Sequence, residues 1–338
     1  MKKNLLRLMM LFVAAVLTNN AFAQGSLLAT LNHEGTISTF YGAQAWKNAH
    51  EAAVNGDVVT LSSGSFLATN ITKAITVRGA GMGIDPTVVV EPTVITGDFN
   101  INIEDSGSSR LTLEGIYSNN SITYTNVVNP LFLKCRLNEV NGSGTTNILK
   151  DASFIHCRIA KGLQLYEGCS ASCVNSVIQR AHSVDTNTSN FEFLNCMIVA
   201  DNLLYTHSSS FKNCIIKGGD GSSKLNGDCT AYNCIGLESS DMFSDITNTT
   251  NKIVSDYATL FKTYTGATLE KLDSENFQLT DEAKTQYLGM DGTEVGIYGG
   301  NLPFDPTPSN PQITKCNVAA KSSADGKLSV DIVVNAAE

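Results

Sequence analysis

A short unit that recurs about every twenty residues constrains the fold of this chain more than any other feature of its sequence. Each unit reads apolar, variable, Asn or a substitute, Cys or Ser, variable, apolar. The fourth positions of the six units are Cys135, Cys157, Ser176, Cys196, Cys214 and Cys234, at steps of 18 to 22 residues. A fixed period of this size indicates stacked coils, because each repeat can then bury its apolar face against its neighbours.

The third position of the unit explains how so short a repeat can turn. Strict alternation would place the first and third residues on one face, whereas the apolar residues are first, fourth and sixth. After Gly, Asn best tolerates the left-handed backbone conformation, so we expect a corner at the third position and an inward-facing fourth residue. Lys134 and His156 replace Asn in the first two units, and we expect those corners to differ in detail.

Short strands joined by corners favour a β-solenoid whose coils pair in parallel at roughly 4.8 Å. A leucine-rich repeat does not fit, because its Leu and Asn spacing is missing from the units. Strand-like runs split by Gly, Asn and Ser extend the pattern upstream, over residues 58–61, 71–77, 88–95, 99–103 and 111–116.

Residues 42–54 precede these runs and carry Ala43, Trp46, Ala49 and Ala53 at helical spacing. An open β-helix end exposes unpaired strand edges. We therefore expect an amphipathic helix that covers this end with Trp46 facing the core. A sugar-stacking platform is the alternative role for Trp46.

At this point the chain resembles a known family. The run Gly56-Asp57-Val58-Val59-Thr60-Leu61 after the helix resembles the start of pectin-lyase-like right-handed β-helix proteins, and 75–81 resembles their next coil. The run 291–300 resembles the close of many bacterial β-helix proteins, especially exported ones of Bacteroidetes. The resemblance spans about residues 38–300 and implies an all-β, right-handed parallel β-helix. It does not imply one activity, because this fold hosts lyases, hydrolases, adhesins and structural spikes.

The N-terminal residues predict export. Lys2, Lys3 and Arg7 precede a short apolar run, and 21–23 read Ala-Phe-Ala, so a secretory signal peptide should be cleaved after Ala23. The net charge of −9 then becomes −12. An acidic chain without basic tracts is a poor nucleic-acid binder, and no later apolar run is long enough for a transmembrane segment.

Residues 24–300 are expected to form the β-helix with its N-terminal cap, and 301–338 a Pro-rich linker followed by a β-hairpin tail. Within the β-helix, 239–290 read as an irregular last coil with one helical stretch near 257–264. The alternating runs 313–319 and 328–334 predict the hairpin. We expect it to fold back over the open C-terminal end, with docking to a partner as the alternative. Oligomeric state is not predicted.

Nine cysteines in an exported chain would ordinarily suggest disulfides. Five of them lie on the repeat, where stacked parallel side chains have poor bridging geometry. Ser176 occupies the same column, so we expect buried thiols that fill space. Cys169 and Cys173 pair or pack inside, and Cys229 and Cys316 are left unassigned. Metal-ligand spacing is not seen, and no cofactor is expected, apart from Ca²⁺ at a carboxylate column.

Two columns of charged residues are candidate sites. Asp151, Glu167 and Asp185 each end a strand-like run. If stacked, they could bind Ca²⁺ or act as general acids, and a solvated acidic edge is the alternative. Lys134, Arg136, His156 and Arg158 occupy matching positions on adjacent coils, with Arg136 and Arg158 expected to point outward together. Arg forks suit uronate or sulfate groups, unless Glu139 neutralises the pair.

The function expected from these features is that of a secreted or cell-surface β-helix, non-catalytic, which binds a polysaccharide or cell-surface glycan or serves as an adhesive scaffold. The second hypothesis is a polysaccharide lyase or glycoside hydrolase that uses Asp151, Glu167 and Asp185. Against it, the Asp-Asp and Gly-His-Gly motifs of polygalacturonase-like enzymes and the acidic Ca²⁺ set of pectate-lyase-like enzymes are not seen. The third is a structural envelope component joined through the hairpin tail.

Overall fold

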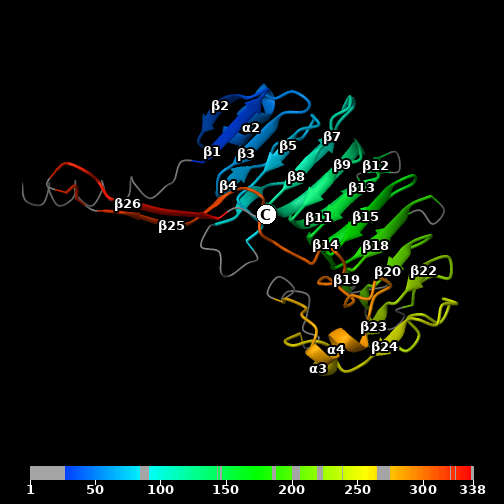
Figure 1. Cartoon of the computed structure of the whole chain (residues 1–338). Helices are drawn as coiled ribbons and strands as arrows, with labels where there is room; N and C mark the ends of the chain where they lie inside the picture. Colours follow the sequence, from blue (N-terminus) through cyan, green and yellow to red (C-terminus); the bar gives the residue numbers. More distant parts are fainter. Residues whose placement is uncertain are drawn as a thin grey trace, which may run out of the picture.

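The protein forms a right-handed parallel β-solenoid of about nine turns, with few helices and a C-terminal antiparallel hairpin (Figure 1). The expected fold class is therefore confirmed. This computed structural model describes residues 27–83, 91–142, 144, 147–184, 188–199, 206–218, 224–237, 239–264, 275–319, 321–323 and 325–335. The expected signal peptide, residues 1–23, lies outside the described residues.

Sheet A forms one face of the solenoid and has eleven strands in the order β2-β1-β3-β5-β8-β10-β13-β15-β18-β20-β22. From β3 onward every neighbouring pair is parallel. The strands are β1 (Leu28–His33), β2 (Thr36–Tyr41), β3 (Val58–Leu61), β5 (Thr76–Arg78), β8 (Thr112–Glu114), β10 (Leu131–Leu133), β13 (Ala152–Ile155), β15 (Ser170–Val174), β18 (Asn190–Leu194), β20 (Ser210–Lys212) and β22 (Thr230–Tyr232).

Sheet B forms the second face and, through long bent strands, the third. Its strands are β4 (Gly64–Leu67), β6 (Thr93–Thr96), β7 (Phe99–Asn102), β9 (Ile116–Val128), β11 (Arg136–Gly142), β12 (Ile148–Lys150), β14 (Arg158–Leu165), β16 (Val177–Ile178), β17 (Ala181–Ser183), β19 (Met197–Val199), β21 (Ile215–Lys217), β23 (Ile235–Leu237) and β24 (Lys252–Val254). A register shift between Leu137 and Glu139 marks the bend from the second face to the third.

The corner between sheets A and B lies at the third position of the repeat. Lys134, His156, Asn175, Asn195, Asn213 and Asn233 all adopt positive φ, from 44° to 55°. Lys134 (52°) and His156 (53°) match the asparagines in φ, so these corners share the backbone conformation and differ in the side chain that they present. The next residue of each unit turns inward, and the six Cys and Ser side chains are at most 1% exposed.

The first position of the repeat forms a second internal file beside the thiols. Phe132 and Phe154 are register partners whose rings stack 4.6 Å apart, and Phe193 stacks on Phe211 at 4.9 Å. Ala231 continues this file opposite Phe211. Ala231 therefore occupies the first position of the last unit, and Tyr232 lies one position later, on the outer face.

The N-terminal end of the solenoid is covered by helix α2 (Ala45–Ala52), whose buried residues are Ala45, Trp46, Ala49 and His50. Ala43 lies outside this helix and is exposed. Lys73 Nζ donates to the carbonyl oxygens of His50, Glu51 and Ala53 at 2.6 to 2.8 Å, which satisfies the free C-terminal carbonyls of the helix. The antiparallel strands β1 and β2, which the sequence patterns did not indicate, extend sheet A on the same side.

The expected last coil is present in the first part of 239–290, where β24 pairs in parallel with β23, and the expected helical stretch near 257–264 contains helix α3 (Tyr257–Leu260). The chain after β24 then leaves the solenoid. It turns back through α3 and α4 (Asp281–Gln286) and builds a second apolar cluster on the outer side of sheet B. This cluster joins outward side chains such as Val177 and Met197 to Phe277, Ile297 and Phe304. At the C-terminal end, Met242 packs against the main core instead.

Residues 288–310, here called the C-terminal strap, run back along the corner between the sheets. Asn233 binds Leu288, Asn213 binds Met290, Asn175 binds Ile297 and Gly299, His156 binds Leu302, and Lys134 binds Asp305 and Thr307. Five of the six corners, from the last coil to the first, thus meet successive residues of the strap, which is an antiparallel clasp and not a free linker.

The hairpin of β25 (Gln312–Val318) and β26 (Val330–Asn335) follows the strap. Just before it, Ser309 binds Glu114, and Asn310 Nδ2 donates to Gly79 O at 3.0 Å. Both anchors belong to early coils, and Figure 1 shows the hairpin projecting from that side of the molecule. The prediction that it covers the C-terminal end is therefore wrong.

Candidate functional site

The basic column lies where the strap crosses the corner and sheet B. The Lys134 side chain is 12% exposed, and its Nζ lies 2.8 Å from Asp305 Oδ2 and 2.6 Å from Thr307 O. His156 is buried, and its Nε2 lies 3.0 Å from Leu302 O. Burial lowers the pKa of His156, which favours the neutral ring. Both side chains are thus engaged by the chain itself.

Arg136 and Arg158 are register partners on adjacent coils, but their surroundings differ. Arg136 lies over the Tyr117 ring at 4.7 Å and donates to Asn119 Oδ1 at 3.3 Å. Arg158 is buried beneath the C-terminal segment, close to the rings of Phe277 and Phe304, with its Nη2 2.7 Å from Glu275 O. The expected pair of outward, accessible arginines is therefore not present.

Glu139 Oε2 accepts a hydrogen bond from Ser121 Oγ at 2.9 Å, and Glu139 is the register partner of Gly162 on the next coil. The basic column is consequently a structural contact for the strap over most of its length. Ligand binding there would require the strap to leave.

The acidic column is not assembled as expected. Asp151 is exposed, has a φ of 53°, and binds Ser170, whose Oγ lies 3.1 Å from Asp151 Oδ1. Ser170, not Glu167, is therefore the neighbour of Asp151 on the next coil. Glu167 is exposed in the turn before β15, and Asp185 lies outside the described residues.

Asp151 does, however, border a hollow of about 210 Å³ on the outer face of sheet A. The hollow spans β13, β15 and β18, which lie side by side in Figure 1. Its polar lining is Asp151, Ser153, Ser170, Ser172, Asn190 and Glu192. We call these six residues the sheet A hollow.

Three side chains of the hollow form one row across the coils, because Ser153, Ser172 and Glu192 are register partners. None of the three has a hydrogen-bond partner among the described residues. Beside them runs an aliphatic row, Ile155, Val174 and Leu194, on the same outer face. The hollow therefore offers unused polar groups next to an apolar strip.

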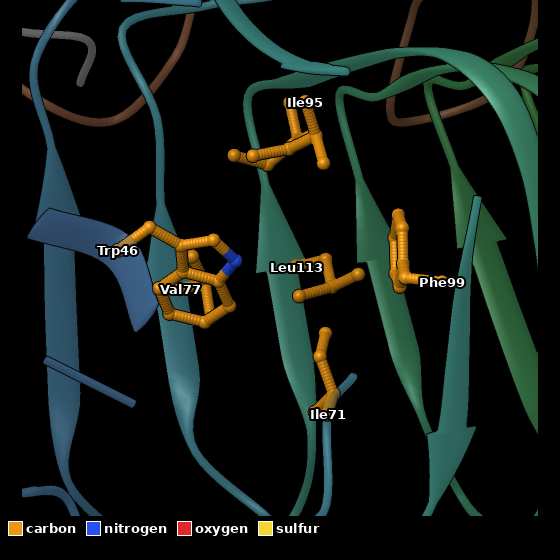
Figure 2. A pocket seen from close by; sticks show the side chains of 7 residues that line it. Trp46, Ile71, Val77, Ile95, Phe99 and Leu113 are labelled. Carbon is orange, nitrogen blue, oxygen red and sulfur yellow. The ribbon is translucent and has the colours of Figure 1, made fainter. Parts of the chain in front are cut away.

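A second, smaller space lies inside the solenoid under the capping helix, as Figure 2 shows. It measures about 10 Å³. It is lined by Trp46, Ile71, Val77, Ile95, Phe99, Leu113 and Ile116. Such a space has at most the size of one water molecule, and its lining has no polar partner for one. It is a packing void, and Trp46 points into the core as a cap rather than outward as a sugar platform.

The cysteines show no sign of reactive or metal-binding chemistry. The eight cysteines whose side chains the structure describes are buried free thiols, and the side chain of Cys316 lies outside this set. Burial raises the pKa of the Cys157, Cys214 and Cys234 thiols well above the usual range, and a nucleophilic thiol would need the opposite shift. Within the described ranges, no group of three or more His, Cys, Asp or Glu side chains is arranged to hold a metal ion.

None of the helices in the described part of the chain is long and apolar enough to cross a membrane. Comparison with known proteins finds no matching family model, no matching curated protein and no matching solved structure. The structure thus shows the fold, and none of these comparisons supports the expected pectin-lyase-like family or an origin in Bacteroidetes.

Sequence reasoning missed the sheet A hollow because its residues are small and polar. Ser153, Ser172 and Glu192 precede the third position of their units by three residues, so their common row follows directly from the repeat. This constant distance of three residues before the corner is the sequence signal from which the row could have been predicted.

Proposed function

We propose that this protein is an exported, non-catalytic β-helix scaffold that binds a neutral glycan in the sheet A hollow. The observation that carries the proposal is the row Ser153, Ser172 and Glu192, which leaves two hydroxyls and a carboxylate unused beside an aliphatic strip. Export is part of the proposal and rests on the N-terminal segment 1–23.

The hollow suits a sugar chain for geometric reasons. Adjacent coils lie roughly 4.8 Å apart, which is close to the length of one sugar ring, so a glycan laid across the coils can meet one polar side chain per residue. Sugar hydroxyls both donate and accept hydrogen bonds, as the Ser hydroxyls do. The aliphatic row can pack against the apolar C–H surface of the rings.

The charge of the hollow favours a neutral ligand. Its only ionisable side chains are Asp151 and Glu192, and carboxylates repel uronate and sulfate groups. Of the two arginines that were expected to attract such groups, Arg158 is covered by Phe277 and Phe304, and Arg136 lies over the Tyr117 ring, outside the hollow. A neutral polysaccharide therefore fits better than the acidic one considered from sequence alone.

The absence of catalysis in this proposal rests on the placement of the carboxylates. A glycosidase pair needs two carboxyl groups across one scissile bond. Asp151 stands at a corner bound to Ser170, and Glu167 lies in the turn three residues before that serine. Glu192 and Asp151 both border the hollow, so product formation must still be measured directly.

The test is retention of the protein on a panel of neutral and acidic insoluble polysaccharides, with reducing-end and unsaturated-product assays on the same samples. We expect retention on at least one neutral polysaccharide and no released product. Each hydrogen bond lost is worth about 0.5–1.5 kcal/mol, so Ser153→Ala combined with Ser172→Ala should weaken binding about tenfold. Product release from a neutral or acidic chain would establish an enzyme instead.

Thr230→Ala is the matched control. Thr230 lies on the same face, beyond the hollow, as the register partner of Ser210. It also loses one hydroxyl on substitution but should leave retention unchanged. Equal loss in the control and in the double variant would place binding elsewhere on the protein.

A further inference from the structure

The hairpin β25–β26 carries an apolar face that its own chain does not cover. Val330, Ile332 and Val334 alternate along β26 and so share one face. Val318 joins them, because it is the register partner of Val330. Their side chains are 50 to 55% exposed, as is Leu328 just before the strand. The opposite face carries the cross-strand pair Asn317 and Asp331.

A two-stranded ribbon with one bare apolar face is poorly suited to exist alone in water. Isolated hairpins are marginally stable and gain stability when such a face packs against another layer. The strap fixes the base of this hairpin through Ser309 and Asn310, and Figure 1 shows the ribbon extending away from the solenoid. Its covering layer must therefore come from outside its own fold.

The charge of this segment points to a second copy of the chain as that layer. Residues 312–338 contain three lysines and three acidic residues, so the segment is neutral. The whole net charge of −9 thus lies in residues 1–311. Two copies repel one another over most of their surface, and the hairpin is the segment that they can bring together without this repulsion.

The composition of the face supports the same occupant. Its five described side chains are all aliphatic, so it offers no charge pattern by which a different partner would be selected. A flat aliphatic face is complementary to itself, as a two-fold symmetric interface requires. We infer that two copies of this protein associate through the apolar faces of their hairpins, stacked as a four-stranded, two-layer contact.

The size of the face sets the strength of this association. Five half-exposed side chains per copy bury less than the roughly 800 Å² per partner of a stable complex. The dimer should therefore be weak, with a Kd above about 1 μM. Because the contact is apolar and the repulsion between the solenoids is electrostatic, added NaCl should strengthen association rather than weaken it.

Sedimentation velocity of the full chain, from micromolar to millimolar concentration, tests this inference. We expect a monomer–dimer equilibrium whose Kd rises about tenfold or more in Ile332→Asp, because a charge is placed in the apolar contact. Val333→Asp adds the same charge on the opposite face, where its register partner is Lys315, and is the matched control, with a Kd close to that of the unchanged protein. A monomer at every concentration, or equal effects of both variants, would overturn the inference.

A second measurement on the unchanged protein guards against a variant hairpin that merely unfolds. Isotopically labelled and unlabelled copies are mixed and treated with an amine-reactive cross-linker. We expect cross-links between copies to join Lys315, Lys321 and Lys327 of one hairpin to those of the other. Links between copies that join solenoid lysines such as Lys212 would contradict the proposed contact.

Discussion

Lys134 Nζ lies 2.8 Å from Oδ2 of Asp305, although 171 residues separate them along the chain. This ion pair joins the first corner of the six-unit repeat to the strap that returns from the last coil. It is the charged member of a series of contacts in which four of the other five corners, Asn233, Asn213, Asn175 and His156, bind the strap through amide or imidazole groups. The corner residues thus serve two purposes: they turn the coil and they hold the strap.

Lys134→Met should loosen the strap near Asp305 without unfolding the solenoid. The pair is partly exposed, so its loss should cost no more than about 1 kcal/mol. Hydrogen–deuterium exchange of residues 302–310 is expected to accelerate, while the amides of β13 and β15 keep their protection. Lys212→Met, on the open face of sheet A, is the control and should leave the strap unchanged. Global loss of protection in Lys134→Met would show that the strap is required for the coil itself.

The stability of the N-terminal cap should fall in mild acid because of His50. Burial, and then the nearby charge of Lys73, lower the pKa of His50 to about 4, and its Nε2 accepts a hydrogen bond from the Thr72 amide. In the unfolded chain the ring has a pKa near about 6.5. A depressed histidine pKa favours the folded state above the unfolded value, and this contribution is lost as pH falls toward 4.

We therefore expect cap stability to decrease by about 3 kcal/mol between about pH 6.5 and 4. Protection factors of the α2 and β1 amides, corrected for intrinsic exchange, measure this change. His50→Gln keeps an acceptor for Thr72 but does not titrate, so its cap should lose much less stability over the same range. An equal pH dependence in that variant would assign the effect to other groups.

The packing void beneath α2 should accept one additional methyl group. Val77→Ile is expected to stabilise the protein by up to about 1 kcal/mol, because it fills the space shown in Figure 2. Trp46→Ala removes the indole that covers the same core and should cost about 3–5 kcal/mol. Urea unfolding followed by far-UV circular dichroism checks both values. Lys47→Ala, on the exposed side of α2, should change stability by no more than about 0.5 kcal/mol.

The thiol column should be inert until the solenoid opens. Cys214 is fully buried, and its Sγ donates to Lys212 O at 3.2 Å. Alkylation of the eight buried thiols is therefore expected to follow the rate of unfolding and not the concentration of reagent. Fast modification of a repeat cysteine in the native protein would contradict this packing.

Substitution at the same position separates volume from chemistry. Cys214→Ser keeps the size and the hydrogen bond of the side chain and should lower the free energy of unfolding by about 1 kcal/mol. A serine is accepted in this column, because Ser176 occupies the same position of its own unit. Cys214→Leu overfills the column and should cost about 1–3 kcal/mol. A larger loss for serine than for leucine would mean that thiol chemistry, rather than volume, fixes the column.

The corner asparagines show which part of the fold can be predicted from the local sequence. Asn175, Asn195, Asn213 and Asn233 predict a left-handed turn because Asn, after Gly, tolerates that backbone best, and the structure has the turn at each of them. Lys134 and His156 adopt the same φ although their side chains favour it less. Their presence is explained by the strap, to which the longer side chains reach, and no local rule contains that partner.

The candidate site shows what the local sequence did not predict, namely which side chains become neighbours and which stay accessible. Asp151 and Glu167 were paired because both end strand-like runs, but the neighbour of Asp151 on the next coil is Ser170, three residues after Glu167. Arg136 and Arg158 were correctly placed in register, yet the exposure of Arg158 depended on a covering segment more than a hundred residues later. Register is a local property of the repeat, whereas accessibility is not.

The sequence by itself therefore determined the period of the coil, its corners and the side chains that face inward. Each of these depends on residues that are close together in the chain and on the equivalent residue of the adjacent coil. The tertiary structure alone decided which outer faces remain open. The C-terminal segment packs against the outer side of sheet B, where an apolar row stabilises a covering layer. The residues of this row include Val177, Met197, Ile215 and Ile235. The segment leaves the outer side of sheet A exposed, because the polar row Ser153, Ser172 and Glu192 does not stabilise such a layer.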